Sequence, residues 1–523
     1  MTERILIEGE WKTAHAAGTF RAHNPATGET LEPEFPISSW EDCDRALTAA
    51  AAIAPILRHT PGAAMGAFLD RYAAAIEARA DEIVATAHLE TALPVQPRLR
   101  DVELPRTTTQ LRQAAESARD GSWMQPVIDT KLNIRSCFAP IGPVVVFGPN
   151  NFPYAFNGVA GGDFAAAMAA GCPVIAKAHP LHATTSRLLA ECAVQALTAS
   201  GLPPATVQML YKFAPADGLR LVSDPRVGAT AFTGSRGAGM RLKAAADASG
   251  RPIYLEMSSL NPIVFLPGSL AERCDELVKE TADSGLAGSG QFCTSPNLLF
   301  LLENPATAHF VDELAKSYAA RAAAPLLSEA GRDQLHRSVR GLVEAGAEVL
   351  TGGEPHAENR GFCFRNTVLR VSGRQFLAEP EQLQQEAFGN AAMAVVCADW
   401  AELLRALTAL EGNLTASIYS SRSGGDDARY GEVAEILRAR CGRLLNDRMP
   451  TGVALSPAMN HGGPFPSTGH PGFTAVGIPR SIQRFGVLQC YDAVRPARLP
   501  QALQDQPDNP RLWRVIDGEW KRG

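Results

Sequence analysis

The sequence predicts an α/β fold with a parallel-sheet domain, a second α/β domain and a small β-ribbon element. The chain has 523 residues, more than one hydrophobic core usually serves, so two or three domains are expected. Residues 140–256 alternate short apolar runs with alanine-rich helical stretches, and a second block of this kind follows Cys293. Strands without polar alternation that are separated by helices are typical of a parallel sheet covered on both faces.

The first block contains five expected strands and three expected helices. The strands are expected at residues 144–147, 174–176, 207–210, 229–232 and 252–256. The helices are expected at residues 162–170, 184–198 and 236–248. This order gives a Rossmann-like layout, in which ligands bind at the carboxyl ends of the strands. We therefore expect a cofactor-binding domain here.

The rest of the chain supplies helices, a second sheet and ribbons. Residues 42–120 are mostly helical by pattern, and the second block has expected strands at 297–302, 392–396 and 416–419. Residues 122–138 and 482–495 look like β-ribbons, and neither has enough core to be stable alone. Residues 7–12 and 516–521 resemble each other and predict two similar hairpins.

These patterns predict the division of the chain. Residues 1–121 and 139–257 form the expected cofactor-binding domain, and residues 258–465 form the catalytic domain. Residues 122–138 and 480–523 form a ribbon and a C-terminal tail.

Composition narrows the classes of partner and location. The net charge of −6 and the lack of a basic run argue against nucleic-acid binding. No apolar run reaches the roughly 18 residues of a membrane span; the longest candidate, 164–176, is interrupted by Gly171 and Pro173. The polar N-terminal residues lack the apolar core of a signal peptide. The ten cysteines form no CxxC pair, so no zinc site or disulfide framework is expected, and a reducing cytoplasm fits.

Cys293 and Glu256 are the candidate nucleophile and base. Cys293 lies among small residues in Gly290-Gln291-Phe292-Cys293-Thr294, where a substrate has room to approach a thiolate. Glu256 follows the apolar run 252–255, so poor solvation should raise its pKa towards the range of a general base. The alternatives are a buried structural cysteine and a solvated glutamate at a strand end.

Two turns after expected strands could bind charged groups. Asn151 follows the strand 144–147, and its amide could donate a hydrogen bond to an oxyanion; the alternative is a structural loop residue before Pro153. The glycine-rich turn 234–239 opens an expected helix, whose first backbone N–H groups suit a pyrophosphate. The turn lacks the GxGxxG pattern of ordinary dinucleotide folds.

The ordered set of these motifs resembles the aldehyde dehydrogenase superfamily from about residue 20 to about residue 490. The motifs are Asn151-Phe152-Pro153, Lys177, Phe232-Thr233-Gly234-Ser235, Leu255-Glu256 and the Gly-Gln-x-Cys turn at Cys293. The resemblance implies NAD(P)-dependent oxidation of an aldehyde to a carboxylate through a cysteine thiohemiacetal and a thioester. It implies that Cys293 attacks the aldehyde, that Asn151 and the Cys293 N–H hold the oxyanion, and that Glu256 activates water.

The resemblance also implies a cofactor site. Lys177 would hold the adenine ribose, and Gly234, Ser235 and Gly239 would hold the pyrophosphate region. In Glu386-Ala387-Phe388-Gly389, Glu386 would bond the nicotinamide ribose and Phe388 would pack beside the nicotinamide. NAD-preferring members often place a glutamate where this chain has Pro180. Without that acid, and with Lys177 and a protonated His179 nearby, NADP is expected, with NAD possible.

Several segments resemble the α-ketoglutaric semialdehyde (2,5-dioxovalerate) dehydrogenase and NADP-dependent branch. They are Leu255-Glu256-Met257-Ser258-Ser259-Leu260, residues 104–108 and residues 461–468. The arginine that this branch often carries beyond the last segment is missing from 470–474. Arg106 could pair with a substrate carboxylate or form a structural salt bridge. Phe152 and Phe156 should line the entrance, which suits an apolar chain.

Other readings stay open at this point. A CoA-acylating aldehyde dehydrogenase would use Cys293 but would not need Glu256 to activate water. An NADP-dependent aliphatic or fatty aldehyde dehydrogenase is the second alternative. A cofactor-free cysteine hydrolase needs a histidine partner, and none of the eleven histidines stands out. No histidine or acidic cluster suggests a metal. Since family ribbons pair between subunits, a homodimer or homotetramer is expected.

Overall fold

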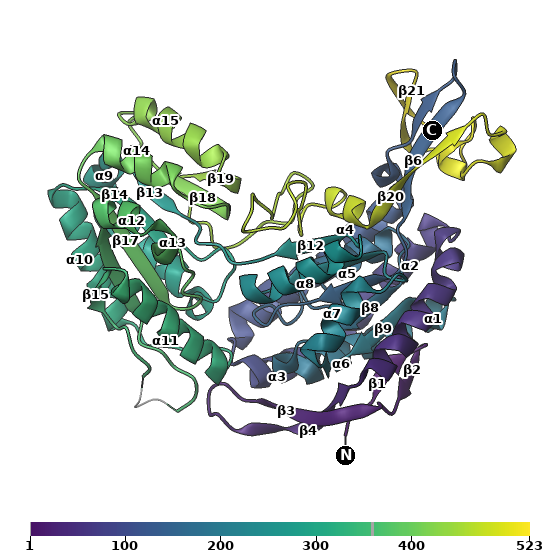
Figure 1. Cartoon of the computed structure of the whole chain (residues 1–523), viewed down its shortest axis with the longest axis horizontal. Coiled ribbons are helices and arrows are strands. Elements are labelled where there is room, and N and C mark those ends of the chain that lie inside the picture. The colour runs from purple at the N-terminus through teal and green to yellow at the C-terminus, as the bar shows by residue number, and fades with distance from the viewer. Residues whose placement is uncertain (1, 357–359) are drawn as a thin grey trace.

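The computed structural model describes residues 2–356 and 360–523, which form two α/β lobes and a projecting ribbon (Figure 1). The sheet of the first lobe has seven strands in the order β12-β11-β7-β8-β9-β1-β2. All five strands predicted for this block are present and parallel: β7 Val144–Phe147, β8 Val174–Lys177, β9 Val207–Leu210, β11 Ala229–Thr233 and β12 Ile253–Glu256. Their side chains are largely buried, as expected where helices cover both faces of a sheet.

An N-terminal hairpin extends this sheet. Strands β1 (Ile5–Ile7) and β2 (Glu10–Lys12) form the hairpin that the sequence predicts, and β1 pairs antiparallel with β9. The sequence analysis did not anticipate a second small sheet, which contains β3 (Ala16–His23), β4 (Thr30–Ser38) and β10 (Lys212–Phe213).

Helices surround the first sheet. The predicted helices correspond to α5 (Gly162–Ala169), α6 (Ala183–Ser200) and α8 (Arg236–Ala248), and α7 (Pro215–Ser223) is additional. The N-terminal helices are α1 Trp40–Arg58, α2 Gly62–Ala78, α3 Ala80–Thr91, the π-helix Val95–Glu103 and α4 Leu104–Asp120. Helix α2 packs between α4 and α6 because its apolar face, with Phe68, Leu69 and Tyr72, is fully buried.

The second lobe is built on another seven-stranded sheet, in the order β15-β16-β17-β14-β13-β18-β19. Its strands are β13 Ile263–Phe265, β14 Leu298–Leu302, β15 Glu348–Thr351, β16 Thr367–Ser372, β17 Ala391–Cys397, β18 Asn413–Tyr419 and β19 Cys441–Asn446. Its helices are α9 Pro267–Leu286, α10 Pro305–Ala320, α11 Glu329–Glu344, α12 Gly373–Ala378, α13 Pro380–Leu383, α14 Trp400–Thr408 and α15 Asp427–Arg438. The three predicted strands of this lobe, β14, β17 and β18, are confirmed.

The ribbon is a five-stranded sheet in the order β20-β6-β5-β21-β22. Its strands are β5 Val127–Asp129, β6 Ile134–Pro140, β20 Gly486–Asp492, β21 Trp513–Ile516 and β22 Glu519–Arg522. The predicted limits were too wide: Ser122–Met124 and Arg480–Phe485 are 3₁₀ turns, since Trp123, Ile482 and Phe485 are buried in the main core. The C-terminal hairpin predicted from the second terminal segment joins this sheet through β21 and β5.

A long irregular segment, residues 447–479, runs between the lobes (Figure 1). It pairs with the end of β12, where the Met257 N–H donates to the Ser467 carbonyl at 2.8 Å and the Gly469 N–H donates to the Leu255 carbonyl at 3.1 Å. This pairing fixes the segment beside Glu256. Within residues 2–356 and 360–523, no helix combines the length and apolar character needed to cross a lipid bilayer.

Candidate active site

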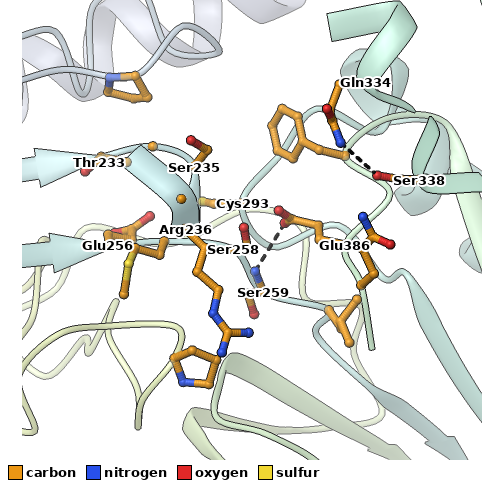
Figure 2. A pocket seen from close by; sticks show the side chains of 18 of the residues that line it. Thr233, Ser235, Arg236, Glu256, Ser258, Ser259, Cys293, Gln334, Ser338 and Glu386 are labelled. Atoms are coloured by element: carbon orange, nitrogen blue, oxygen red, sulfur yellow. Dashed lines mark hydrogen bonds between the residues drawn. The ribbon is translucent and has the colours of Figure 1, made fainter. Parts of the chain in front are cut away.

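A cavity of about 790 Å³ lies between the two lobes (Figure 2). The first lobe contributes the turn 234–237 and the end of β12, and the second lobe contributes Glu386 and Phe388. Asn151, Glu256 and Cys293 also line this cavity, so the structure brings the three predicted catalytic residues together. A second cavity of about 160 Å³ shares Cys293 with the first. The thiol therefore lies between two spaces that could hold two different molecules.

The turn before Cys293 is shaped by left-handed backbone conformations. Gly288, Ser289 and Gly290 have φ values of 54°, 56° and 67°. A side chain at Gly290 would have its Cβ 2.0 Å from the Gly389 carbonyl oxygen, so only glycine allows this approach. The Asn261 amide donates to the carbonyls of Cys293 and Ser295 at 2.9 Å each, which holds the turn in place.

His461 contacts Cys293, although none of the eleven histidines stood out in the sequence as its partner. The Cys293 Sγ lies 3.2 Å from His461 Nε2, and His461 Nδ1 lies 3.2 Å from Glu256 Oε2. The imidazole is 3% exposed. Burial opposes its charge, but Glu256 and Cys293 raise the pKa of His461 to about 10. Burial raises the pKa of the Cys293 thiol, whereas His461 lowers it. The three groups can thus share a proton, with Glu256 stabilising an imidazolium beside the sulfur.

Glu256 is buried, and its carboxylate makes few contacts with other groups of the protein. Its exposure is 1%, and His461 provides its one ion-pair contact in the described part of the chain. Neither carboxylate oxygen accepts a well-aligned hydrogen bond from any described residue. A buried acceptor without a donor is costly unless water or a ligand supplies one. This carboxylate is therefore available to hold and deprotonate a water molecule.

Asn151 is held against the cysteine turn. Its side-chain Nδ2 donates to the Gln291 backbone carbonyl at 2.8 Å, and the Asn151 backbone carbonyl accepts from Arg98 Nη2 at 3.0 Å. An amide nitrogen has two hydrogens, so one remains for a substrate oxygen. Arg98 comes from the π-helix and forms a buried ion pair with Glu103, whose other oxygen accepts from the N–H groups of Tyr154 and Ala155. This network fixes the loop that carries Asn151.

The cofactor residues predicted from the sequence separate into two groups. Gly234, Ser235, Glu386 and Phe388 line the large cavity, whereas Lys177, His179 and Gly239 lie outside its lining. Burial raises the pKa of Glu386 to about 7, although the Ser258 side chain and the Ser259 N–H, at 3.2 Å from Oε1, oppose this (Figure 2). A carboxyl so placed can accept hydrogen bonds from ribose hydroxyls. The Ser235 side chain does not cap α8, so the first N–H groups of that helix remain available to a phosphate. The large cavity therefore fits a dinucleotide.

Lys177 and His179 lie near the end of β8. Burial and the neighbouring Lys212 lower the pKa of Lys177 to about 8. Burial, followed by Lys177 and His182, lowers the pKa of His179 well below its usual value. His179 also accepts a hydrogen bond from the Leu181 N–H at 3.3 Å. His179 is thus neutral near pH 7, and the attraction expected from a protonated His179 is not available.

The small cavity has aromatic and basic walls. Phe152, Phe156 and Phe292 line it, and the Phe152 ring packs edge-on against the other two. Arg106 also lines it, with its guanidinium 5.8 Å from the centre of the Phe156 ring. Arg106 Nη1 donates to the Val453 carbonyl, while Nε and Nη2 are buried without a hydrogen-bond partner among the described residues. An aldehyde chain with an anionic end fits this lining.

The aldehyde dehydrogenase family model matches residues 11–463. The chain belongs to the aldehyde dehydrogenase family. Family membership establishes an NAD(P)-dependent oxidoreductase that acts on aldehydes.

Individual relatives are consistent with this assignment. The chain is 38% identical to alpha-ketoglutaric semialdehyde dehydrogenase 2 of Azospirillum brasilense, over 99% of each chain. It is 34% identical to an alpha-ketoglutaric semialdehyde dehydrogenase of Acinetobacter baylyi, over 98% of each chain. A crystal structure of a putative aldehyde dehydrogenase from Burkholderia cenocepacia has a TM-score of 0.79 and 22% identity, and covers 96% of this chain and 99% of that one. This last similarity supports the fold.

His461 and Lys212 are the functional candidates of this aldehyde dehydrogenase that sequence reasoning missed. His461 is 168 residues from Cys293 in the chain, and no local pattern links them. Its place beside Gly462-Gly463-Pro464, in a segment resembling the family, was the available signal.

The sulfur of Cys293, a nitrogen of His461 and an oxygen of Glu256 lie within 4.8 Å of one another, a ligand set that Zn²⁺ accepts. The absence of a metal from the reaction therefore stays a prediction.

Proposed function

We propose that this aldehyde dehydrogenase oxidises a carboxylate-bearing semialdehyde, such as α-ketoglutaric semialdehyde, to the corresponding dicarboxylate. The observation that carries the proposal is the buried guanidinium of Arg106, which has two unpartnered nitrogens among the described residues in the cavity beside Cys293. A carboxylate would supply the missing acceptors. Two full-length relatives named for α-ketoglutaric semialdehyde support the same substrate class.

The proposed mechanism assigns one role to each residue of the catalytic centre. His461 Nε2 takes the thiol proton of Cys293, and Glu256 balances the imidazolium. The thiolate attacks the aldehyde carbon, and Asn151 and the Cys293 N–H stabilise the oxyanion. Loss of a hydride from the resulting thiohemiacetal carbon, for which a bound nicotinamide would be the acceptor, leaves a thioester. Glu256 then deprotonates the water that hydrolyses the thioester on Cys293, which releases the acid.

Arg106→Gln should weaken the use of a carboxylate-bearing semialdehyde. Charge-assisted hydrogen bonds to a buried group contribute about 1.5–3 kcal/mol, so the KM for this substrate should rise about 10- to 100-fold. The KM for an uncharged aldehyde of the same length should change less than about threefold, on the scale of a neutral contact. Steady-state kinetics with the two substrates measures the difference.

Arg112→Gln is the matched control for this experiment. Arg112 lies on the same helix, α4, but pairs with Glu77 on the surface, at 2.6 Å. It should leave both KM values unchanged. An equal rise for both aldehydes in Arg106→Gln would show that Arg106 is structural. A lower KM for the uncharged aldehyde in the wild type would instead favour an aliphatic aldehyde dehydrogenase. The three phenylalanines of the small cavity would also suit an uncharged chain.

We further propose that NADP is preferred over NAD. Ala178-His179-Pro180 places no carboxylate after β8, and Lys177 and Lys212 lie close enough to interact. The kcat/KM with NADP should therefore exceed that with NAD for one aldehyde. The carboxylate introduced by Pro180→Glu should repel the 2′-phosphate and weaken NADP binding by about 1–4 kcal/mol. The preference for NADP over NAD should then fall at least about fivefold. Pro180→Gln controls for the loss of proline. A wild type that prefers NAD, or an unchanged ratio in Pro180→Glu, would contradict the proposal.

The remaining proposals concern organisation and location. We propose the division into residues 1–121 and 139–257 for cofactor binding, 258–465 for catalysis, and 122–138 and 480–523 for assembly.

The ribbon exposes large apolar side chains that a second subunit would cover, which supports a homodimer or homotetramer. These side chains are Val127, Leu132, Leu488, Trp513 and Trp520. Buried thiols such as Cys43, Cys172 and Cys192 fit a reducing cytoplasm. A CoA-acylating activity is not favoured, because transfer of the acyl group to CoA would make no use of the unpartnered Glu256 carboxylate as a base for water.

A further inference from the structure

An ion pair between the two lobes lies along the wall of the large cavity. Arg236 is the first residue of α8 in the first lobe, and Glu411 lies between α14 and β18 in the second. Arg236 Nη1 is 2.8 Å from Glu411 Oε2, and Nη2 is 3.4 Å from Oε1. Both residues line the cavity, and Figure 2 shows the Arg236 side chain reaching into it. The pair therefore connects the two lobes through the space that a dinucleotide would fill.

Both partners are anchored through their backbones. The Glu411 N–H donates to Gln384 Oε1 at 2.8 Å, and the Glu411 backbone carbonyl accepts from Asn413 Nδ2 at 3.0 Å. These bonds hold the backbone of Glu411 on the wall of the second lobe, while helix α8 holds that of Arg236. The side chains of Arg236 and Glu411 are 43% and 37% exposed, and the Arg236 guanidinium also lies over the Phe465 ring, at 5.7 Å. Arg236 can therefore change partner by rotating its own side chain.

We propose that Arg236 is a ligand for a cofactor phosphate and that Glu411 competes with the cofactor for it. The proposal rests on the cofactor site proposed above. A phosphate bound at the first N–H groups of α8 lies next to the base of the Arg236 side chain, and guanidinium binds phosphate through two parallel hydrogen bonds. Cofactor binding thus exchanges the Arg236–Glu411 pair for an Arg236–phosphate pair, and the competition weakens cofactor binding.

The dissociation constant of NADPH, measured by its fluorescence without aldehyde, tests this exchange. Glu411→Gln should tighten NADPH binding about two- to fivefold, which corresponds to the loss of a half-exposed ion pair. Arg236→Gln should weaken binding about tenfold, as for a lost charge-assisted bond. In a protein that already carries Arg236→Gln, Glu411→Gln should tighten NADPH binding by a much smaller factor than it does in the wild type. The reason is that the competition for Arg236 no longer exists.

Two control variants separate the possible failures. Glu435 is exposed on α15 of the second lobe and lines neither cavity, so Glu435→Gln removes the same charge without touching Arg236, and it should leave the dissociation constant unchanged. Glu386→Ala should weaken binding if the cofactor occupies the proposed site. If Glu386→Ala weakens binding while Glu411→Gln has no effect or weakens it, the site stands and the competition is refuted. Equal tightening by Glu435→Gln would also refute the competition, and no effect of Glu386→Ala would refute the site itself.

Discussion

Cys293→Ala should abolish aldehyde oxidation and leave NADPH binding intact. The Sγ atom lies where the two cavities meet, 3.2 Å from His461 Nε2, and no other thiol lines either cavity in the described part of the chain. Removal of the nucleophile from a set of groups that act as a unit lowers kcat by about 10⁴-fold or more. The dissociation constant of NADPH should stay within about twofold, a change under about 0.5 kcal/mol. Steady-state rates and a fluorescence titration measure the two quantities.

Cys490→Ala is the control for this experiment. Cys490 is exposed on β20, far along the ribbon, so its loss should not change either quantity. A Cys293→Ala variant that keeps more than about a tenth of the wild-type kcat, a loss under about 1.4 kcal/mol, would rule out Cys293 as the nucleophile.

Glu256→Gln should form NADPH once per active site and then turn over slowly. The substituted amide keeps the shape of the side chain and an acceptor for His461, but it cannot take a proton from water. Thioester hydrolysis should therefore slow by about 10²- to 10⁴-fold, the usual contribution of a general base. Stopped-flow absorbance should show a rapid burst of NADPH followed by a slow steady state.

His461→Gln distinguishes the two possible roles of Glu256. His461 touches the sulfur, so its loss should slow the burst itself, since the thiol then lacks a proton acceptor. If Glu256→Gln slows the burst as much as the steady state, the carboxylate acts through His461 on the thiol. A Glu256→Gln variant with unchanged steady-state turnover would exclude both roles.

The sequence predicts the parts of the fold that depend on local pattern. The parallel strands β7, β8, β9, β11 and β12 are uninterrupted apolar runs between helices, and each is found where it was expected. Strand β16 was missed because Thr367-Val368-Leu369-Arg370-Val371-Ser372 mixes polar and apolar residues. Strand β13 has only three residues, too few for a pattern. The irregular segment 447–479 has no periodicity at all, so its position beside β12 could not be predicted.

The catalytic centre shows the same limit. Cys293, Glu256 and Asn151 each stand in a local motif, and the structure places all three along one cavity. His461 becomes a candidate only through its contact with Cys293, and Lys212 only through the effect of its charge on Lys177. Arg98 is similar: it holds Asn151 from a π-helix that no pattern indicated. Sequence motifs thus point to the proposed reacting groups, while tertiary packing brings in the residues proposed to orient them.

The irregular segment 447–479 has a consequence for biosynthesis. Ribosomes add residues from the N-terminus, so Cys293 is present long before His461 is made. Until that segment pairs with Leu255 and Met257, the thiol lacks the imidazole that lies 3.2 Å from its sulfur. The proposed proton acceptor of Cys293 is therefore among the last parts of the site to be synthesised and placed. A chain that stops before this segment would carry the thiol without the group that pairs with it.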